Sequence, residues 1–214
     1  MFSNLSLETI IANIPALLIG LAFHECAHAW AADRLGDPTP RSQGRLSLNP
    51  LVHLDPIGTL ACLLFRFGWA KPVMINVYNF KNPIRGRMLV SLAGPVTNLI
   101  IGLIATIIYF FAQIWLTASW GGTLNQILFA IIAVNLSLGV FNLLPIPPLD
   151  GFAILAGLLP QRLAIRLYAL ERYGMILLML VLISNVAGTV LSPLVGLIWN
   201  VYQAIAVSLI SLFI

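Results

Sequence analysis

The sequence predicts an all-α, polytopic membrane protein, and two observations carry this prediction. The first is composition, because only 8% of the 214 residues are charged and 60% are hydrophobic. A soluble domain normally carries about a quarter charged residues, so this chain has too little polar surface to cover itself in water. The second is the length of its apolar runs, several of which approach the ~20 residues that a helix needs to cross a bilayer. Together they predict one intramembrane domain over residues 1–214.

Five apolar runs are long enough for full membrane-spanning helices. They cover residues 8–32, 88–116, 123–144, 173–191 and 193–214. A sixth run, 51–65, is shorter and is interrupted by His53, Asp55 and Pro56, so we expect a re-entrant or partial helix there. A crossing by this run, giving six in all, is the alternative. No Lys or Arg precedes the first run, so we expect a retained helix rather than a cleaved signal peptide.

The basic residues predict the topology. All eleven Lys and Arg fall within two segments, 34–87 and 162–172. If run 51–65 does not cross, both segments lie on one side, which the positive-inside rule makes the cytosolic one. We therefore expect the N-terminus outside and the C-terminus in the cytosol. The net charge of +4 does not indicate nucleic acid, because the basic residues flank apolar spans, as lipid headgroups favour.

The connections between the runs have patterns of their own. Residues 38–50 alternate polar and apolar side chains toward their end, and residues 69–80 are rich in β-branched and aromatic residues. Both predict short β-strands at the membrane surface. Residues 160–172 place leucines on one helical face and arginines opposite, which predicts an amphipathic interfacial helix.

The stretch "FHECAH" places three ionisable groups inside the first apolar run. His24 and His28 are four residues apart, so on a helix they point the same way and can bind one zinc ion. Glu25 stands about 100° round the helix, where it can reach a zinc-bound water but is poorly placed as a ligand. This is the arrangement H-E-x-x-H, with two ligands and a general base. The alternative is a pair of neutral core histidines, but ionisable groups at membrane depth are costly and usually functional.

A catalytic zinc site needs a third protein ligand, and Asp150 is the strongest candidate. It stands in "FNLLPIPPLDG" (141–151), where three prolines break an apolar run near its end. Broken helices at membrane depth normally line a cavity or pack inside the protein. The alternative for Asp150 is a solvated turn residue. The other candidates are His53, Asp55 and three acids that we expect at the surface, Asp33, Asp37 and Glu171.

Three motifs together resemble the site-2 protease family of intramembrane zinc metalloproteases (peptidase family M50). They are "HECAH" (24–28), "SLAGPVTN" (91–98) and "NLLPIPPLDG" (142–151), in this order. Because the sequence has no inserted PDZ domain, the resemblance is to the short prokaryotic type. It implies one Zn²⁺ per chain on His24, His28 and Asp150, Glu25 as the base, and Asn142 near the active site. It also implies a catalytic core over about 8–151, followed by helices in 160–214.

The expected function is therefore an intramembrane zinc endopeptidase of a prokaryotic cell membrane. Its substrates are expected to be transmembrane proteins or peptides, cut near the cytosolic face. Asn142 is a candidate donor to the oxyanion, whereas Asn98 and Asn135 are expected to hold helices together. His53 and Asp55 could support the site, gate it or cap the partial helix. The alternative function is a non-proteolytic zinc-containing membrane protein that binds client helices.

Overall fold

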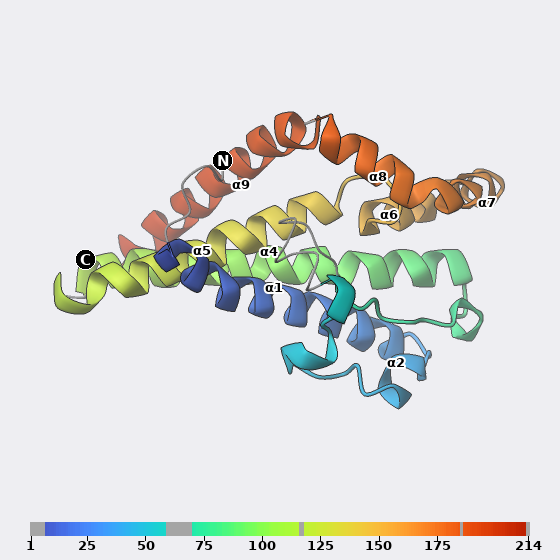
Figure 1. Cartoon of the computed structure of the whole chain (residues 1–214), viewed down its shortest axis with the longest axis horizontal. Helices are drawn as coiled ribbons and strands as arrows, with labels where there is room; N and C mark the ends of the chain where they lie inside the picture. The colour runs from blue at the N-terminus through green and yellow to red at the C-terminus, as the bar shows by residue number, and fades with distance from the viewer. Residues whose placement is uncertain (1–6, 59–69, 116–117, 185, 213–214) are drawn as a thin grey trace.

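The computed structural model describes residues 7–58, 70–115, 118–184 and 186–212, most of which are helical (Figure 1). Four of the helices contain a stretch that is long and apolar enough to cross a membrane. They are α1 (Leu7–Arg34), α4 (Pro83–Trp115), α5 (Ala118–Asn142) and α9 (Val186–Ile210). The all-α, multi-pass architecture predicted from the sequence is confirmed at this level.

Helix α4 is the centre of the bundle. It packs against α1, α5, α9 and the short helix α6 (Asp150–Leu158). Ile132 and Leu136 of α5 are almost completely buried in a cluster with Tyr202 of α9. The Tyr202 hydroxyl donates to the Leu99 carbonyl of α4 at 2.8 Å, which ties α9 to the central helix.

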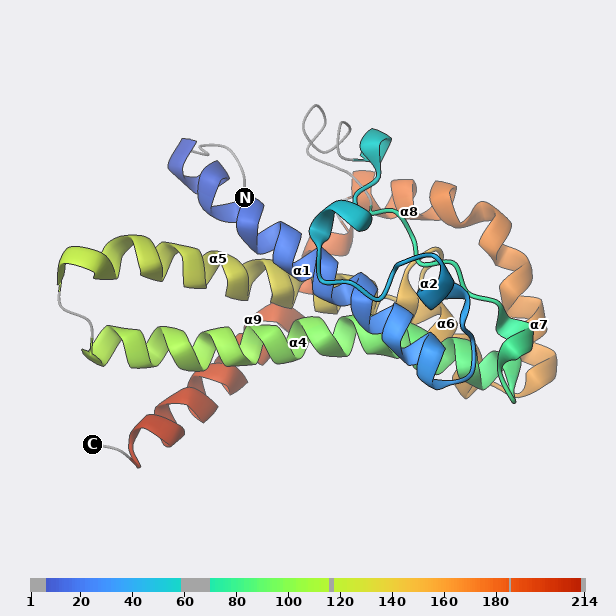
Figure 2. The same cartoon turned by 90° about the horizontal axis from the view of Figure 1, so that it is seen from below.

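The short elements gather at one end of the bundle (Figures 1 and 2). This end holds α2 (Thr39–Ser42), α6, α7 (Gln161–Tyr168) and the 3₁₀ turn η3 (Ala169–Tyr173). The start of α1, the end of α4 and the end of α9 lie at the opposite end. The helix expected over 160–172 is present as α7 and η3, and its Arg162 and Arg166 are exposed.

The described residues contain no β-strand, so the strands expected over 38–50 and 69–80 are wrong for the part that the structure describes. Residues 38–50 form α2 and turns, and only an isolated bridge pairs Leu54 with Ala70. In residues 70–80, side chains make hydrogen bonds to backbone groups that a neighbouring strand would otherwise bond. The Arg45 guanidinium donates to the carbonyls of Lys71 and Pro72, and the Asn76 N–H donates to Asp37.

The C-terminal third differs from the two crossings expected over 173–191 and 193–214. Helix α8 (Gly174–Ile183) has ten residues, about 15 Å, which is half of a bilayer core. It ends at Ile183, and the hydroxyl of Ser184, which follows it, donates to the Val181 carbonyl. Helix α9 begins at Val186 and runs to the opposite end of the bundle (Figure 1). The end of α9 therefore lies at the end of the bundle where α1 begins. The C-terminus was expected at the other end, with the basic segments. Most of run 51–65 lies outside the described residues; its described part holds the 3₁₀ turn η1 (Pro50–Val52) and a helical turn at 56–58.

Candidate metal centre

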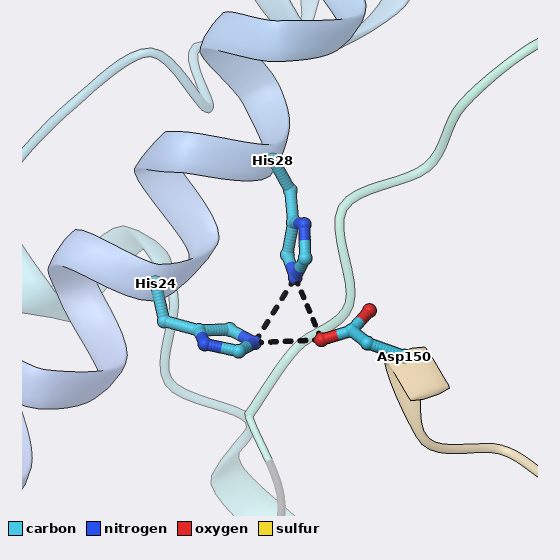
Figure 3. Close-up of side chains that lie close together, drawn as sticks. All are labelled: His24, His28 and Asp150. Carbon is cyan, nitrogen blue, oxygen red and sulfur yellow. Dashed lines mark hydrogen bonds and ion pairs between the residues drawn. The ribbon is translucent and has the colours of Figure 1, made fainter. Parts of the chain in front are cut away.

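Three side chains from two distant segments converge between α1, α4 and α6. His24 and His28 lie one turn apart on α1, and Asp150 opens the first turn of α6 (Figure 3). The two Nε2 atoms are 3.0 Å apart, and one Asp150 oxygen lies 3.2 Å from His24 Nε2 and 3.3 Å from His28 Nε2. Both histidines are buried. The structure thus brings together the three residues that the sequence analysis selected as ligands.

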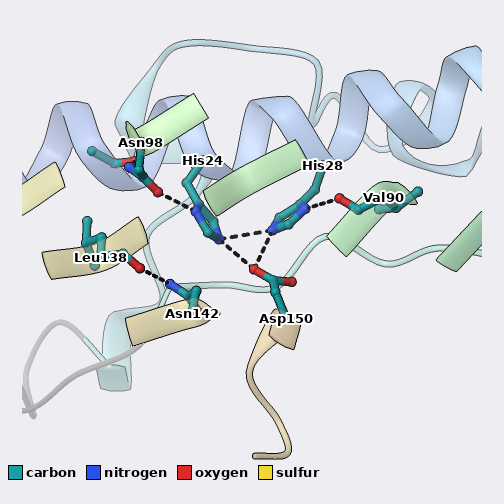
Figure 4. A network of polar contacts seen from close by, with 8 residues as sticks. His24, His28, Val90, Asn98, Leu138, Asn142 and Asp150 are labelled. Atoms are coloured by element: carbon teal, nitrogen blue, oxygen red, sulfur yellow. Dashed lines mark hydrogen bonds and ion pairs between the residues drawn. The ribbon is translucent and has the colours of Figure 1, made fainter. Parts of the chain in front are cut away.

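Hydrogen bonds fix which nitrogen of each imidazole carries the proton. His28 Nδ1 lies 2.7 Å from the Val90 carbonyl, which can only accept, so Nδ1 is the donor. His24 Nδ1 lies 2.6 Å from the Asn98 side-chain oxygen (Figure 4). The Asn98 amide nitrogen donates to the Gly20 carbonyl and to Asn135 Oδ1, so its oxygen is left to accept from His24. In the neutral imidazoles both Nε2 atoms therefore carry a lone pair that faces Asp150.

This donor set fits a zinc ion. Two nitrogen lone pairs and a carboxylate oxygen at 3.0–3.3 Å repel one another unless a cation lies among them. Tetrahedral zinc with bonds of about 2.0–2.1 Å holds its ligand atoms about 3.3 Å apart, which is close to the observed spacings. Three protein ligands leave the fourth position open, as in catalytic rather than structural zinc sites. The three residues also form the one group of metal-binding side chains found in the described part of the chain.

The backbone of α4 closes the site on one side. A Cβ atom added to Gly94 would lie 2.5 Å from His28 Nε2 and 2.6 Å from His24 Cε1. Only glycine lets α4 approach the imidazoles this closely. On the other side, a Cβ at Gly151 would lie 2.2 Å from the Leu143 carbonyl oxygen, so this glycine permits the tight return that carries Asp150 back toward α1.

Comparison with known proteins decides the family. YwhC of Bacillus subtilis is 39% identical over 186 residues, which cover 86% of this chain and 85% of that protein. The chain belongs to peptidase family M50. The model of that family matches residues 116–184. Rip2 of Mycolicibacterium smegmatis is 28% identical over 182 residues, 81% of this chain and 67% of that protein. Both names describe their proteins provisionally as zinc metalloproteases. No solved structure matches the chain.

Membership of M50, the site-2 protease family, makes the chain a zinc metalloprotease, as the sequence motifs implied.

The other two expected site residues, Glu25 and Asn142, lie beside the three-residue cluster without joining it. Glu25 is half-buried and adjacent to His24 on α1. Asn142 ends α5, and its side-chain nitrogen donates to the Leu138 carbonyl of its own helix at 3.0 Å (Figure 4).

Asn98 is the residue whose role the sequence analysis of this M50 chain missed. It was expected to join helices, and it does contact Asn135. It also accepts a hydrogen bond from His24 Nδ1, so it sets the orientation of that imidazole. The available signal was the spacing of Gly94 and Asn98 in "SLAGPVTN", which puts a small residue and an amide on one face of α4.

The remaining candidates lie outside the M50 cluster. His53 is buried, and its Nε2 donates to the Ser47 carbonyl at 2.7 Å. Asp55 accepts the Gly58 N–H at 2.7 Å, so it caps the helical turn at 56–58, as one of the open alternatives held. Asp37 was expected at the surface but is fully buried. Its carboxylate tolerates burial because it accepts hydrogen bonds from Thr39, Asn76 and Asn79.

Proposed function

We propose that this M50 protease cleaves membrane-embedded substrate helices close to the cytosolic face. The observation that supports this is the position of the donor set within helices that can span a bilayer. His28 and His24 precede the end of α1 at Arg34 by about 9 and 15 Å of helix rise. A peptide bond would therefore be cut inside the hydrocarbon region, in its cytosolic half.

The orientation of this proposal rests on charge. The end of the bundle that holds the short elements also holds Arg34, Arg41, Arg87, Arg162 and Arg166. The positive-inside rule assigns such an end to the cytosol. The start of α1 then lies outside, and with four crossings the end of α9 lies outside as well.

We propose that the ligands of the zinc ion are Nε2 of His24, Nε2 of His28 and the carboxylate of Asp150. When bound, zinc supplies Lewis-acid activation of a water molecule and of the substrate carbonyl. The carboxylate of Glu25, one residue from a ligand, accepts the proton of the attacking water. It then returns that proton to the leaving amide nitrogen, so one side chain serves as base and as acid.

Asn142 is proposed to steady the charge that develops on the substrate oxygen. One N–H of its amide donates to the Leu138 carbonyl, which fixes the side chain at the end of α5. The second N–H is left to donate to an oxyanion, a role worth about 10²–10³-fold in rate in other hydrolases. Its test is Asn142→Ala, which should lower kcat without lowering zinc content; unchanged kcat would remove Asn142 from the mechanism.

The proposed function is tested by Glu25→Gln in vesicles that contain a transmembrane helix as substrate. The variant should keep its zinc and lose cleavage by at least about 10²-fold, because glutamine cannot take up a proton. Glu171→Gln is the matched control, since Glu171 pairs with Arg87 away from the site, and it should cleave normally. Wild-type protein that retains the helix uncut would favour the non-proteolytic alternative instead.

A further inference from the structure

A groove lies where the end of α1 meets the start of α4, away from the metal centre. Three cations, Arg34, Lys81 and Arg85, line it together with Leu35, Phe80 and Leu89. We call this the α1–α4 groove. Its volume is about 320 Å³. Its floor is apolar, since Phe80 is buried against α4 so closely that a Cβ at Gly86 would lie 2.4 Å from the Phe80 ring.

The three cations of the α1–α4 groove carry no compensating charge. The carboxylates nearest in sequence are engaged elsewhere, because Asp33 pairs with Arg41 and Asp37 accepts four hydrogen bonds. In the part of the chain that the structure describes, no ion pair includes Arg34, Lys81 or Arg85. The positive end of the α4 dipole adds to this charge. The groove therefore favours an anion.

The position of the α1–α4 groove relative to the membrane indicates which kind of anion it binds. Arg34 ends one candidate membrane span, and Pro83, between Lys81 and Arg85, begins another, so the cations stand at the boundary of the hydrocarbon region. Arg34 lies over the ring of Trp30, 5.2 Å from its centroid, and Trp30 is 54% exposed, as is usual for an interfacial anchor.

An exposed apolar stripe leads from the groove along α4. It continues from Leu89 at spacings of three or four residues, the spacing of one helical face. Its members are Leu89, Leu92, Val96, Ile100, Ile104 and Ile108. A ligand with a negative head and a long apolar tail therefore matches both parts of this surface. An acidic peptide or a soluble anion matches only the cations.

We propose that the α1–α4 groove binds one anionic phospholipid, with its phosphate among Arg34, Lys81 and Arg85 and its acyl chains along α4. Basic pockets at the cytosolic ends of membrane helices suit such headgroups, because each Lys or Arg near the surface contributes to the attraction. The site is separate from the proposed peptidase chemistry and does not depend on it.

The test is native mass spectrometry of the purified full chain with phosphatidylglycerol and with phosphatidylcholine of identical acyl chains. Wild-type protein should bind one phosphatidylglycerol in preference to phosphatidylcholine. The variant Arg34→Gln/Lys81→Gln/Arg85→Gln should lose about fivefold in affinity per charge, on the order of a hundredfold in total. The charge-matched control Lys71→Gln/Arg162→Gln/Arg166→Gln removes three exposed cations elsewhere and should keep the preference.

Equal losses in the two triple variants would mean that the lipid is attracted by net charge, and the proposal would be wrong. Displacement of phosphatidylglycerol by millimolar inorganic phosphate would make the groove a site for soluble anions and would also overturn it. A third variant, Arg34→Lys/Arg85→Lys, guards against misfolding. It keeps the charges and should keep lipid binding, whereas a loss there would contradict an electrostatic site.

Discussion

At the scale of single residues, the metal centre depends on the groups that hold its histidines. A chain of hydrogen bonds runs from α5 to His24. Asn135 donates to the Ile131 carbonyl, Asn98 donates to Asn135, and His24 donates to Asn98. Each donor in this run has a defined acceptor, so the protonated nitrogen of His24 is fixed. A ligand held in one tautomer and one orientation binds metal without first losing rotational freedom.

Asn98→Leu should therefore weaken zinc binding. Leucine keeps the branched shape of asparagine but cannot accept the hydrogen bond from His24 Nδ1, so the imidazole loses its orientation, at a cost of about 10–100-fold in metal affinity. The measurement is zinc retention against a chelator series. Thr106→Val on the same helix is the control, because the Thr106 hydroxyl donates only to the Gly102 carbonyl one turn away. Equal zinc affinity in the two variants would show that Asn98 only joins helices.

Gly94→Ala should abolish zinc binding in a chain that still folds. The added methyl group would lie 2.5 Å from Nε2 of His28, which no rotamer change of alanine can relieve. Gly102→Ala is the matched control on α4, because there the nearest atom is 3.5 Å away, an ordinary contact. The control should bind zinc and gain up to about 1 kcal/mol of helix stability. Normal zinc content in Gly94→Ala would contradict the close packing of α4 on the site.

Some residues of the candidate metal centre can be selected from one short segment of sequence, and others only from the way two helices pack. His24, Glu25 and His28 are selected by spacing on one helix, and Asp150 by the prolines that precede it. The role of Asn98 depends on the register between α1 and α4, which no single segment contains. The same limit applies to Gly94, whose absent side chain matters only because two imidazoles face it.

At the scale of elements, a buried carboxylate joins the two connections at the basic end. Asp37 follows α1 and accepts hydrogen bonds from Thr39 and from Asn76 and Asn79 of the next connection. Burial opposes the charge, but these hydrogen bonds outweigh it and hold the pKa of Asp37 below its ordinary value of 3.8. The contribution of Asp37 to stability is therefore present above pH 3.8 and is lost as the pH falls through the lower folded-state pKa.

Asp37→Asn should therefore destabilise the protein at pH 7 by about 1–3 kcal/mol, since hydrogen bonds to a charged acceptor are lost. The difference from wild type should shrink as the pH falls below 3.8 through the lowered pKa of Asp37, because the native carboxylate then becomes protonated itself. Thermal unfolding in detergent at pH 7 and over a series of lower pH values measures this. Asp55→Asn is the control, because asparagine also caps the turn at 56–58 and should change stability little. A gap that is independent of pH would contradict the charged state of Asp37.

The elements show where sequence patterns predict structure and where they do not. Long apolar runs predicted α1, α4 and α5 because such runs have one stable form in a bilayer. The β-branched and aromatic residues of 69–80 favoured a strand, but Arg45 and Asp37 supply hydrogen bonds that a partner strand would have made. Those two side chains come from another connection, so local propensity could not reveal them.

At the scale of the whole molecule, the number of membrane crossings decides on which side of the membrane the end of α9 lies. Residues 173–191 and 193–214 are each long enough to span, which led to an expectation of two crossings. In the structure α8 ends at Ile183, and α9 runs on from Val186 to the opposite end of the bundle, so the two helices together match one traverse of the bundle rather than two (Figure 1). Length and composition could not separate these cases, because both segments are apolar throughout.

Cysteine labelling in intact cells tests this topology. With Cys26 and Cys62 replaced, Thr123→Cys at the start of α5 and Ser211→Cys after α9 should react with a membrane-impermeant thiol reagent from the same side. Gln161→Cys, at the start of α7, should react only from the opposite side. Labelling of Ser211→Cys together with Gln161→Cys would restore the five-crossing arrangement.

The central claim is that His24, His28 and Asp150 hold the zinc of this M50 protease. Its most direct measurement is the zinc content of purified protein by mass spectrometry, for wild type and Asp150→Ala. One Asp150 oxygen lies within 3.3 Å of both Nε2 atoms, so we expect one zinc per wild-type chain. We expect Asp150→Ala to lose that zinc with its helical content unchanged. An Asp150→Ala protein that retains zinc with wild-type affinity would contradict it.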